Sequence, residues 1–251
     1  MPGHKGRLIV CEGIDGSGKT VQSALLKNRL IQEKFKVTAF DFPRYGDPPS
    51  GCPASFFERK YLQKPGFGFT KGYGLADRVG PYAASMFYAV DRIDAVFCQE
   101  QRPNLWDYLN EGFIVVSNRY TESNIGHQGG RINKHGERIK FIEWLMEAEY
   151  ELFKIPKPNL VILFKIPPET AFELKQKQRQ GQKFAKDLHE KDPNHLKRAA
   201  WSYAEAAALF PNYWRIIEVV DKKESKLFPP EKIHELVWQE VQKVLPEEAK
   251  K

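Results

Sequence analysis

Short runs dominated by apolar residues alternate with longer amphipathic stretches along most of the chain. Five such runs, at 8–11, 37–40, 113–116, 160–164 and 216–220, are expected to be strands buried on both faces. Helical spacing of apolar residues predicts helices over 20–35, 81–101 and 193–209, and a last helix with Ile233, Leu236, Val237, Val241 and Val244 on one face. The alternation predicts βαβ units around a parallel sheet.

The helix expected at 81–101 has two distinct faces. Met86, Ala89, Val90, Ile93 and Phe97 form an apolar stripe that should face the core. A second face carries Ser85, Tyr88 and Arg92, which repeat at i, i+3 and i+7. This polar face is free to line a site.

Length and composition are ordinary for a globular protein. The 251 residues contain neither an internal repeat nor a clear linker, so we expect a single domain over 1–251, with an unusually long connection at 43–80. The net charge of +7 favours anionic partners without separating nucleotides from nucleic acids or membrane surfaces. The apolar runs are too short to span a bilayer, so no membrane association is expected. Cys11, Cys52 and Cys98 are too few for a disulfide framework, and we expect a reducing, cytoplasmic location.

One glycine-rich motif carries the strongest chemical signal. The segment Gly13-Ile14-Asp15-Gly16-Ser17-Gly18-Lys19-Thr20 fits the pattern G-x-x-x-x-G-K-[ST], follows an expected strand and opens an expected helix. In such a P-loop, backbone N–H groups and the helix N-terminus hold phosphates, the lysine reaches the outer phosphates and the threonine holds Mg²⁺. We therefore expect these eight residues to bind ATP, with Mg²⁺ as cofactor and Lys19 in a catalytic role.

Several further segments, in order, resemble the thymidylate kinase family. They are Asp41-Phe-Pro-Arg-Tyr45, Tyr88-Ala-Val-Asp-Arg92, Asn118-Arg-Tyr-Thr-Glu-Ser-Asn124, Pro156-Lys-Pro-Asn-Leu160 and Asp187-Leu-His-Glu190. Each is weak alone, but their order and spacing match from about residue 8 to 220. The resemblance implies a P-loop NTPase fold of three layers, with a five-stranded parallel sheet flanked by helices and a mobile lid at about 175–190. It also implies a homodimer.

The resemblance assigns roles around the acceptor nucleotide. Arg44 and Arg119 would hold its phosphate, and a guanidinium suits this task because it donates two parallel hydrogen bonds. Tyr88 would stack on thymine and Arg92 would contact a base carbonyl. The remaining positions that match substrate-binding residues are Asp15, Tyr45, Ser123, Asn124 and His127. Asp15 and Arg119 are also expected to be catalytic.

Three positions depart from the family pattern. Asn118 stands where an aspartate near Mg²⁺ is usual, so we expect it to act through a bound water, with Thr20 and Asp15 as the other residues at the metal. His127 replaces a tyrosine near the sugar, and Tyr88 replaces the commoner phenylalanine. Deoxyribose selectivity is therefore an open question.

The P-loop lacks the arginine that some relatives carry, because Gly16 fills that position. The resemblance then places the catalytic charge in the lid. Arg179 is our candidate, assisted by Lys183 and Lys186, while Asp187 and Glu190 match carboxylates at the base of the lid.

The sequence therefore predicts a kinase that converts ATP and dTMP to ADP and dTDP. A kinase for other deoxynucleoside monophosphates, or for unphosphorylated deoxynucleosides, is the first alternative. The latter should carry a catalytic acid after the second strand, where this chain has Arg44. A nucleic-acid-associated ATPase is a remote alternative, and no nucleic-acid motif accompanies the charge.

Overall fold

The computed structural model describes residues 5–46, 51–64, 66–74, 78–100, 103–178, 194–221 and 226–246. Its centre is a five-stranded parallel sheet with strand order β2-β3-β1-β4-β5. The strands are β1 (Arg7–Glu12), β2 (Val37–Asp41), β3 (Ile114–Asn118), β4 (Leu160–Lys165) and β5 (Trp214–Glu218). The predicted fold class is thereby confirmed.

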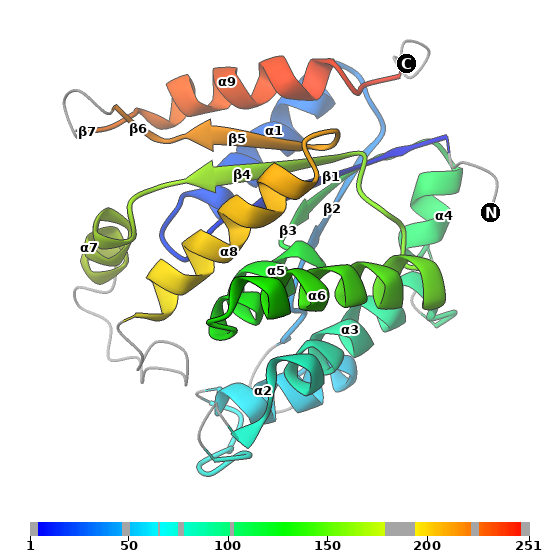
Figure 1. Ribbon diagram of the computed structural model, residues 1–251. Coiled ribbons are helices and arrows are strands. Elements are labelled where there is room, and N and C mark those ends of the chain that lie inside the picture. Colours follow the sequence, from blue (N-terminus) through cyan, green and yellow to red (C-terminus); the bar gives the residue numbers. More distant parts are fainter. Residues whose placement is uncertain are drawn as a thin grey trace.

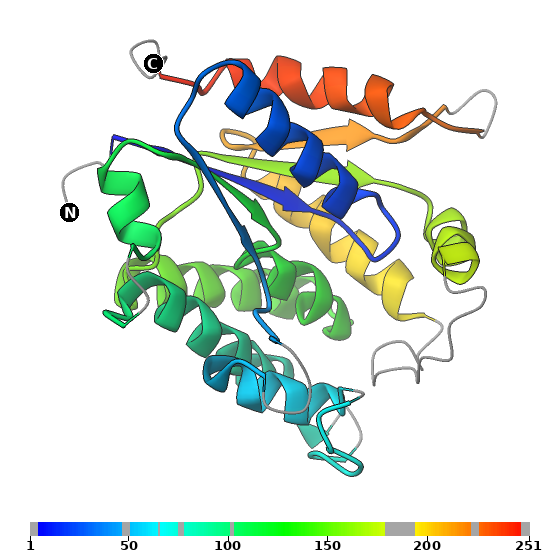
Figure 2. The same ribbon diagram turned by 180° about the vertical axis from the view of Figure 1, so that it is seen from behind.

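Helices cover both faces of the sheet and complete three layers (Figures 1 and 2). One face carries α1 (Lys19–Gln32) and α9 (Pro230–Gln242), which pack on each other. The other carries α3 (Pro81–Phe97), α5 (Glu122–His127), α6 (His135–Met146) and α8 (His195–Leu209). The short α2 (Phe56–Leu62) packs on α3 on the side away from the sheet.

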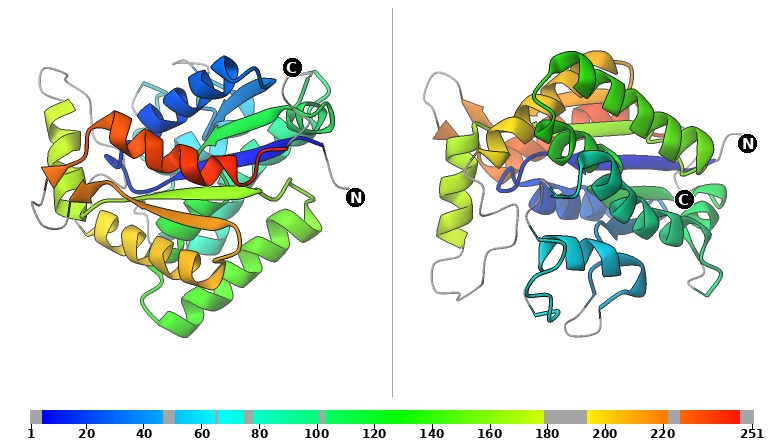
Figure 3. Two further views of the ribbon diagram at one scale, coloured as in Figure 1. Left: turned by 90° about the horizontal axis from the view of Figure 1, so that it is seen from above. Right: turned by 60° about the horizontal axis from the view of Figure 1, so that its bottom comes forward.

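Shorter elements connect these layers. They are η1 (Pro53–Ser55), α4 (Leu105–Asn110), η3 (Gly129–Arg131), the π-helical η4 (Glu147–Leu152), α7 (Pro168–Gln178) and the two-stranded pair β6 (Val220–Asp221) and β7 (Lys226–Leu227). Figure 3 shows that α7 stands beyond the carboxyl ends of the strands. Within the described residues, no helix is both long and apolar enough to cross a membrane.

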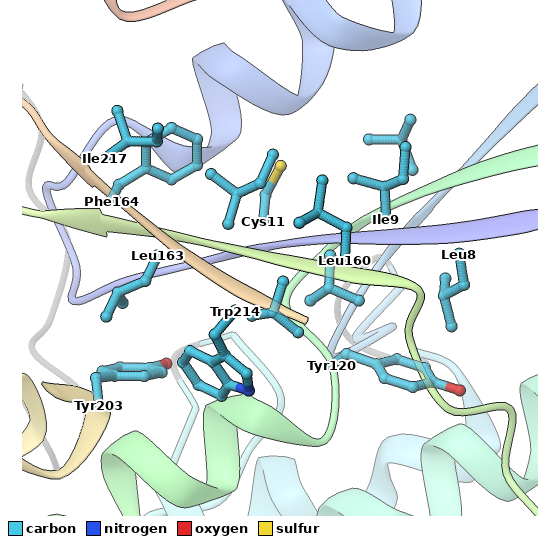
Figure 4. Close-up of a cluster of buried hydrophobic side chains, with 14 of the residues drawn as sticks. Leu8, Ile9, Cys11, Tyr120, Leu160, Leu163, Phe164, Tyr203, Trp214 and Ile217 are labelled. Atoms are coloured by element: carbon cyan, nitrogen blue, oxygen red, sulfur yellow. The ribbon is translucent and has the colours of Figure 1, made fainter. Parts of the chain in front are cut away.

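The central strands form the middle of the hydrophobic core (Figure 4). All five residues of β3 are buried, as are five of the six in β1 and in β4. Cys11 is fully buried as expected, and burial raises the pKa of its thiol to about 12. The expectation of burial was wrong for β2, which has no fully buried residue, and for much of β5. These two strands are the edges of the sheet, where one side lacks a neighbouring strand.

Two other expectations need correction. The fifth strand occupies 214–218 rather than 216–220, because the apolar run continues past the strand through Val219 into β6. The stripe on α3 is only partly a core face: Val90 and Phe97 are each 41% exposed. Helical spacing identifies an apolar face but does not say what covers it.

The carboxyl ends of three neighbouring strands bring the functional segments together. Asn118, the last residue of β3, is in register with Cys11 of β1 and with Asp41, the last residue of β2. The P-loop follows β1, and residues 42–46 and 119–121 follow the other two strands. In open α/β sheets this edge is where ligands bind.

Candidate active site

The loop between β1 and α1 has the backbone conformation of a phosphate cradle. Gly16 (φ +88) and Gly18 (φ +86) adopt the left-handed conformation that favours glycine. A Cβ on Gly16 would lie 2.4 Å from the backbone oxygen of Ala171, so a larger residue there would push α7 away. The loop ends at Lys19, the first residue of α1, whose N-terminus favours anions.

Lys19 lies beneath this loop and is 5% exposed. Its Nζ donates a hydrogen bond to the backbone oxygen of Ile14 (3.2 Å) and lies 3.6 Å from Asp15 Oδ1. Burial and the nearby Arg119 lower the pKa of Lys19 to about 8, although Asp15 opposes the shift. Lys19 therefore places a buried amino group directly at the phosphate cradle.

Asp15 is surrounded by positive side chains, which we call the cationic cluster: Lys19, Arg119 and Lys175. Arg119 donates to Asp15 Oδ1, and Lys175 Nζ donates to Asp15 Oδ2 at 2.7 Å. Burial would raise the pKa of the Asp15 carboxyl, but attraction to Arg119, Lys19 and Lys175 holds it well below its usual value. The three cations thus share one carboxylate at the position where phosphates are expected.

Arg119 is held in an unusual backbone conformation. It follows β3 with φ +66, a left-handed conformation that costs about 1–3 kcal/mol for residues other than glycine. Its backbone N–H donates to Cys11 O (3.0 Å), which fixes the turn against β1. In this conformation its guanidinium contacts Asp15 of the P-loop.

Asn118, Thr20 and Asp41 meet beside the P-loop. Asn118 Nδ2 donates to Asp41 Oδ1 (2.8 Å) and to Thr20 Oγ1 (3.3 Å). Asn118 Oδ1 is buried and has no hydrogen-bond partner within the described ranges. Burial raises the pKa of Asp41 above its usual value, while the hydrogen bond from Asn118 acts in the opposite direction. Of the three residues expected at the metal, the structure brings Thr20 and Asn118 together, whereas Asp15 is engaged by the cationic cluster.

A cavity of about 310 Å³ opens next to Asp15 and extends between α3, α5 and α8. It has the size of a site for a small organic ligand. The lining residues are Asp15, Asp41, Phe42, Pro43, Tyr45, Leu62, Lys64, Tyr88, Arg92, Arg119, Tyr120, Ser123, Asn124, His127, Gln128 and His195. Eight of the nine predicted substrate-binding residues are among them, and Arg44 is not.

Arg44 faces α3 instead of the cavity. Its Nε donates to Asp91 Oδ1 (2.8 Å), its NH2 group donates to Asp94 Oδ2 (2.5 Å), and its backbone N–H donates to Asp91 Oδ2 (2.7 Å). Burial opposes the charge of Arg44, but Asp91 and Asp94 outweigh it and raise the pKa of the guanidinium. In this structure Arg44 fastens the segment after β2 to α3, and its expected role in holding a phosphate stays a prediction.

The inner end of the cavity contains what we call the inner ion-pair cluster: Arg92, Glu149, Thr121 and Asn124. Arg92 makes two parallel hydrogen bonds to Glu149, with Nε to Oε2 at 2.6 Å and NH2 to Oε1 at 2.5 Å. Thr121 Oγ1 (2.7 Å) and Asn124 Nδ2 (3.4 Å) donate to the same carboxylate. The guanidinium is 2% exposed and Glu149 is fully buried. This cluster fixes Arg92 and Asn124 before any ligand arrives.

Aromatic and polar side chains line the rest of the cavity. Lys64 Nζ lies 4.5 Å from the centre of the Tyr45 ring. Ser123 Oγ is 2.9 Å from each carboxylate oxygen of Glu12, to which it donates. Glu12, the last residue of β1, therefore fixes the orientation of this hydroxyl. Tyr88 lines the wall from α3, on the predicted face that also carries Arg92.

His127 forms a chain of contacts with residues from two other elements. Its Nε2 lies 2.9 Å from Arg119 NH1, and its Nδ1 lies 3.0 Å from His195 Nε2. The two imidazole rings stack with centroids 5.2 Å apart. His195 belongs to α8, so this contact links Arg119 to a helix to which the sequence analysis assigned no role.

The proposed lid residues fall outside the described residues. This applies to Arg179, Lys183, Lys186, Asp187 and Glu190. The segment expected to form the lid is described only as far as Gln178, the end of α7, and Lys175 in this part contacts Asp15.

Several site residues were missed by sequence reasoning. Asp41 was quoted as part of a motif without a role, although its place at the end of a strand could have drawn attention to it. Glu149, Glu12 and His195 carry no local signal, because they come from elements distant in the sequence. Lys175 lies at the start of the expected lid, and nothing in the sequence singles it out.

A family model, related sequences and a solved structure all point to the same protein family. The family model described as "Thymidylate kinase" matches residues 11–226. A probable thymidylate kinase from Pyrobaculum aerophilum is 31% identical over 173 residues, covering 69% of this chain and 71% of the relative. The thymidylate kinase of Mycobacterium tuberculosis is 28% identical over 203 residues, covering 80% and 86%. The solved structure of thymidylate kinase from Candida albicans superimposes with a TM-score of 0.65 at 20% identity, covering 95% of this chain and 92% of that one, which supports the fold.

Proposed function

The chain belongs to the thymidylate kinase family, and we propose that it transfers the γ-phosphoryl group of ATP to dTMP, producing ADP and dTDP. The observation that carries this proposal is the position of Arg119. It lines the acceptor cavity and at the same time contacts Asp15 of the P-loop, so one arginine joins the two substrate sites. Phosphoryl transfer requires this adjacency, because the attacking and leaving oxygens must be in line.

The acceptor base occupies the inner end of the cavity in this proposal. Tyr88 supplies an aromatic face for stacking, worth about 1–3 kcal/mol in comparable base–aromatic contacts. Arg92 and Asn124 are held by Glu149, so their remaining donors and acceptors read the edge of a pyrimidine without reorganising.

The acceptor phosphate then binds Arg119 in place of the Asp15 carboxylate. The carboxylate is a weaker competitor than a phosphate dianion, which carries twice its charge. Freed from Arg119, Asp15 can accept a hydrogen bond from a sugar hydroxyl. The lid residues Arg179, Lys183 and Lys186 remain our proposal for additional charge, and Lys175 of α7 adds a further cation beside Asp15.

Lys19 and Lys175 meet the negative charge of the transferred phosphoryl group. Fixed cations at a charge-developing position commonly contribute about 10²- to 10³-fold in rate each. Both lysines are already close to Asp15 and need only small movements to face a phosphate. Closing the lid over them would exclude water from the reaction.

The residues beside the P-loop fit a magnesium ion. Thr20 supplies a hydroxyl, and Asn118 supplies a buried amide oxygen with no partner within the described ranges. We propose that these two hold Mg²⁺, Asn118 through a bound water. The ion would neutralise part of the phosphate charge, and it usually retains several waters and needs few carboxylates.

A coupled ADP-release assay tests the reaction most broadly. We expect turnover with dTMP to exceed that with dUMP, UMP, dCMP, AMP and thymidine. Turnover with another acceptor and none with dTMP would overturn the proposal. Turnover with thymidine alone would favour the deoxynucleoside kinase. Slow ATP hydrolysis independent of any acceptor, with salt-sensitive DNA or RNA binding, would favour the ATPase.

We also propose a homodimer formed through α3. Ala83, Val90 and Phe97 repeat every seven residues, and all three are exposed. A second copy of the chain would cover this stripe, as in other pairs of packed helices. Sedimentation velocity should show a dimer that Val90→Asp converts to a monomer. Val21→Asp, at an exposed valine of α1, should leave the dimer intact.

The cytoplasmic location is likewise part of the proposal, supported by the three cysteines, which are free thiols. Cell fractionation tests it: the protein should appear with cytosolic markers, and enrichment with a membrane or secreted fraction would contradict it.

A further inference from the structure

We infer that Asp41 is the carboxylate that secures the divalent cation of the metal–nucleotide substrate, taking the place of the aspartate that the end of β3 lacks. The inference rests on the proposed nucleotide kinase function and assigns a residue that neither the family resemblance nor the comparisons point to. It follows from three observations around Asn118.

The first observation is the position of Asp41 relative to Asn118. The two residues are the last of adjacent parallel strands and are directly in register. Their side chains are in contact, with Asn118 Nδ2 2.8 Å from Asp41 Oδ1. A carboxylate displaced by one strand therefore still reaches the location that a carboxylate on β3 would serve.

The second observation is that the side-chain amide of Asn118 uses its nitrogen but not its oxygen in hydrogen bonds with the described residues. Its amide nitrogen faces both Asp41 and Thr20 Oγ1, the hydroxyl that a P-loop uses for the cation. Its amide oxygen is buried without a partner among the residues that the structure describes, and the whole residue is 8% exposed. A buried polar atom left unpaired is costly unless a ligand or water completes it. A hydrated cation beside Thr20 would do so.

The third observation concerns the charges around the two candidate carboxylates. Asp15 is contacted by Lys19, Arg119 and Lys175, so its negative charge is already balanced. Asp41 forms no ion pair within the described part of the chain, and its hydrogen-bond partner is a neutral amide. Of these two carboxylates, Asp41 is the one whose negative charge is available to a divalent cation. Both Asp41 and Thr20 are exposed, which leaves room for the waters that Mg²⁺ retains.

A simpler role for Asp41 would be to hold Asn118 in place as a surface hydrogen-bond acceptor. In that case, replacing it with asparagine would disturb local packing but would not alter how much a metal ion contributes to nucleotide affinity. The quantity that separates the two roles is therefore the metal-dependent gain in nucleotide affinity. We define it as the dissociation constant of AMP-PNP in EDTA divided by that in saturating Mn²⁺.

Calorimetric titrations of the full-length enzyme with AMP-PNP measure this gain directly. For Asp41→Asn we expect the metal-free affinity to stay the same or improve, because a negative charge is lost near the phosphates. The metal-dependent gain should fall by about 10- to 100-fold, the range usual for losing a supporting group at a metal site. A gain equal to that of the parent enzyme would overturn the inference.

A double variant that exchanges the two side chains distinguishes loss of the carboxylate from misfolding or a general loss of affinity. In Asp41→Asn with Asn118→Asp, the carboxylate and the amide exchange places while their hydrogen bond is preserved. We expect this double variant to recover most of the metal-dependent gain. A double variant as weak as Asp41→Asn would contradict the inference.

The acceptor assay keeps this result separate from the proposed function. A parent enzyme that phosphorylates dTMP, combined with an unchanged metal-dependent gain in Asp41→Asn, would remove only the role of Asp41. An enzyme with no activity toward dTMP would remove the proposed function itself.

Discussion

The two ends of the acceptor cavity neutralise their arginines in different ways. At the inner end, Arg92 forms two parallel hydrogen bonds with Glu149, and both side chains are almost fully buried. At the P-loop end, Arg119 shares Asp15 with two lysines, and the Asp15 side chain is 31% exposed. Arg92 shares its carboxylate only with the neutral groups of Thr121 and Asn124 among the described residues, while Arg119 belongs to a cluster with more positive than negative charge.

This difference separates recognition from chemistry. A paired and buried arginine stays in place, so it can read a base edge with fixed geometry. An arginine in a cluster with surplus positive charge attracts anions, and its carboxylate partner can yield to a phosphate. We conclude that the inner ion-pair cluster is built to remain unchanged during turnover, whereas the cationic cluster is built to exchange partners.

The largest expected effect comes from breaking the inner ion-pair cluster. Glu149→Gln leaves Arg92 charged and buried without a counter-ion, which typically costs about 3–5 kcal/mol of stability. For a chain of this length, the melting temperature should fall by about 2–4 °C for each kcal/mol. Differential scanning calorimetry measures the change. Glu151→Gln, an exposed position in the same π-helical segment, is the control and should melt like the parent. Equal melting temperatures for the two variants would show that Arg92 does not depend on Glu149.

A second buried carboxyl, that of Glu122, differs from Glu149 because its hydrogen-bond partner, Tyr150, is neutral. Glu122 accepts a hydrogen bond from Tyr150 OH (2.6 Å), and burial raises its pKa to about 8. Between its unfolded pKa, about 4.3, and pH 8, the folded state keeps a proton that the unfolded state loses. Stability from this group should therefore decrease as pH rises through that window, by about 5 kcal/mol at most, and level off above about pH 8.

Urea unfolding at a series of pH values checks this dependence. The Glu122→Gln variant cannot ionise, so its stability relative to the parent should increase from pH 5 to pH 8. A constant difference between the two proteins across this range would mean that Glu122 is not protonated in the folded state.

The next effect concerns a single cation of the P-loop end. Lys175→Met removes a positive charge that contacts Asp15 and is expected to lower kcat by about 10²-fold, or about 2.7 kcal/mol of barrier. The KM for dTMP should change little. Lys177→Met, at an exposed position on the same helix, is the matched control. Steady-state kinetics that show equal kcat values for the two variants would remove Lys175 from the transfer step.

The smallest effect on stability is expected when Asp15 loses its charge. Asp15→Asn should lower the free energy of unfolding, because Arg119, Lys19 and Lys175 lose the carboxylate that they share, but by less than Glu149→Gln, since the Asp15 side chain is 31% exposed and Glu149 is fully buried. The same change should tighten binding of metal-free tripolyphosphate, since the phosphates no longer compete with a carboxylate for Arg119. Calorimetry that shows weaker tripolyphosphate binding would contradict the exchange of partners.

The sequence predicts the framework of the site better than its electrostatics. The P-loop and the strand before it follow a local pattern, and eight of the nine predicted substrate-binding residues line one cavity. The orientation of Arg44 was not predictable in the same way, because its partners Asp91 and Asp94 lie on a helix about fifty residues later. A motif gives the position of an arginine in the chain, but the acidic side chains around it determine the direction of its guanidinium.

The sequence pattern also could not predict which charged side chains are buried or which residues they contact. Glu149 sits among residues with no distinctive spacing, and only the packing of η4 against α3 and α5 places it beneath Arg92. Similarly, Asn118 was recognised as a departure from the family, but the nearby Asp41 became visible only through the register of β2 and β3.

The most direct test of this account compares the binding of dTMP and thymidine to the parent enzyme and to Arg119→Ala. Because Arg119 is assigned to the phosphate alone, calorimetry should show dTMP binding weakened by about 10- to 100-fold, the loss usual for hydrogen bonds to a charged group. Thymidine binding should stay unchanged. Equal weakening of both ligands would contradict the division of the cavity into a fixed inner end and a phosphate-exchanging end.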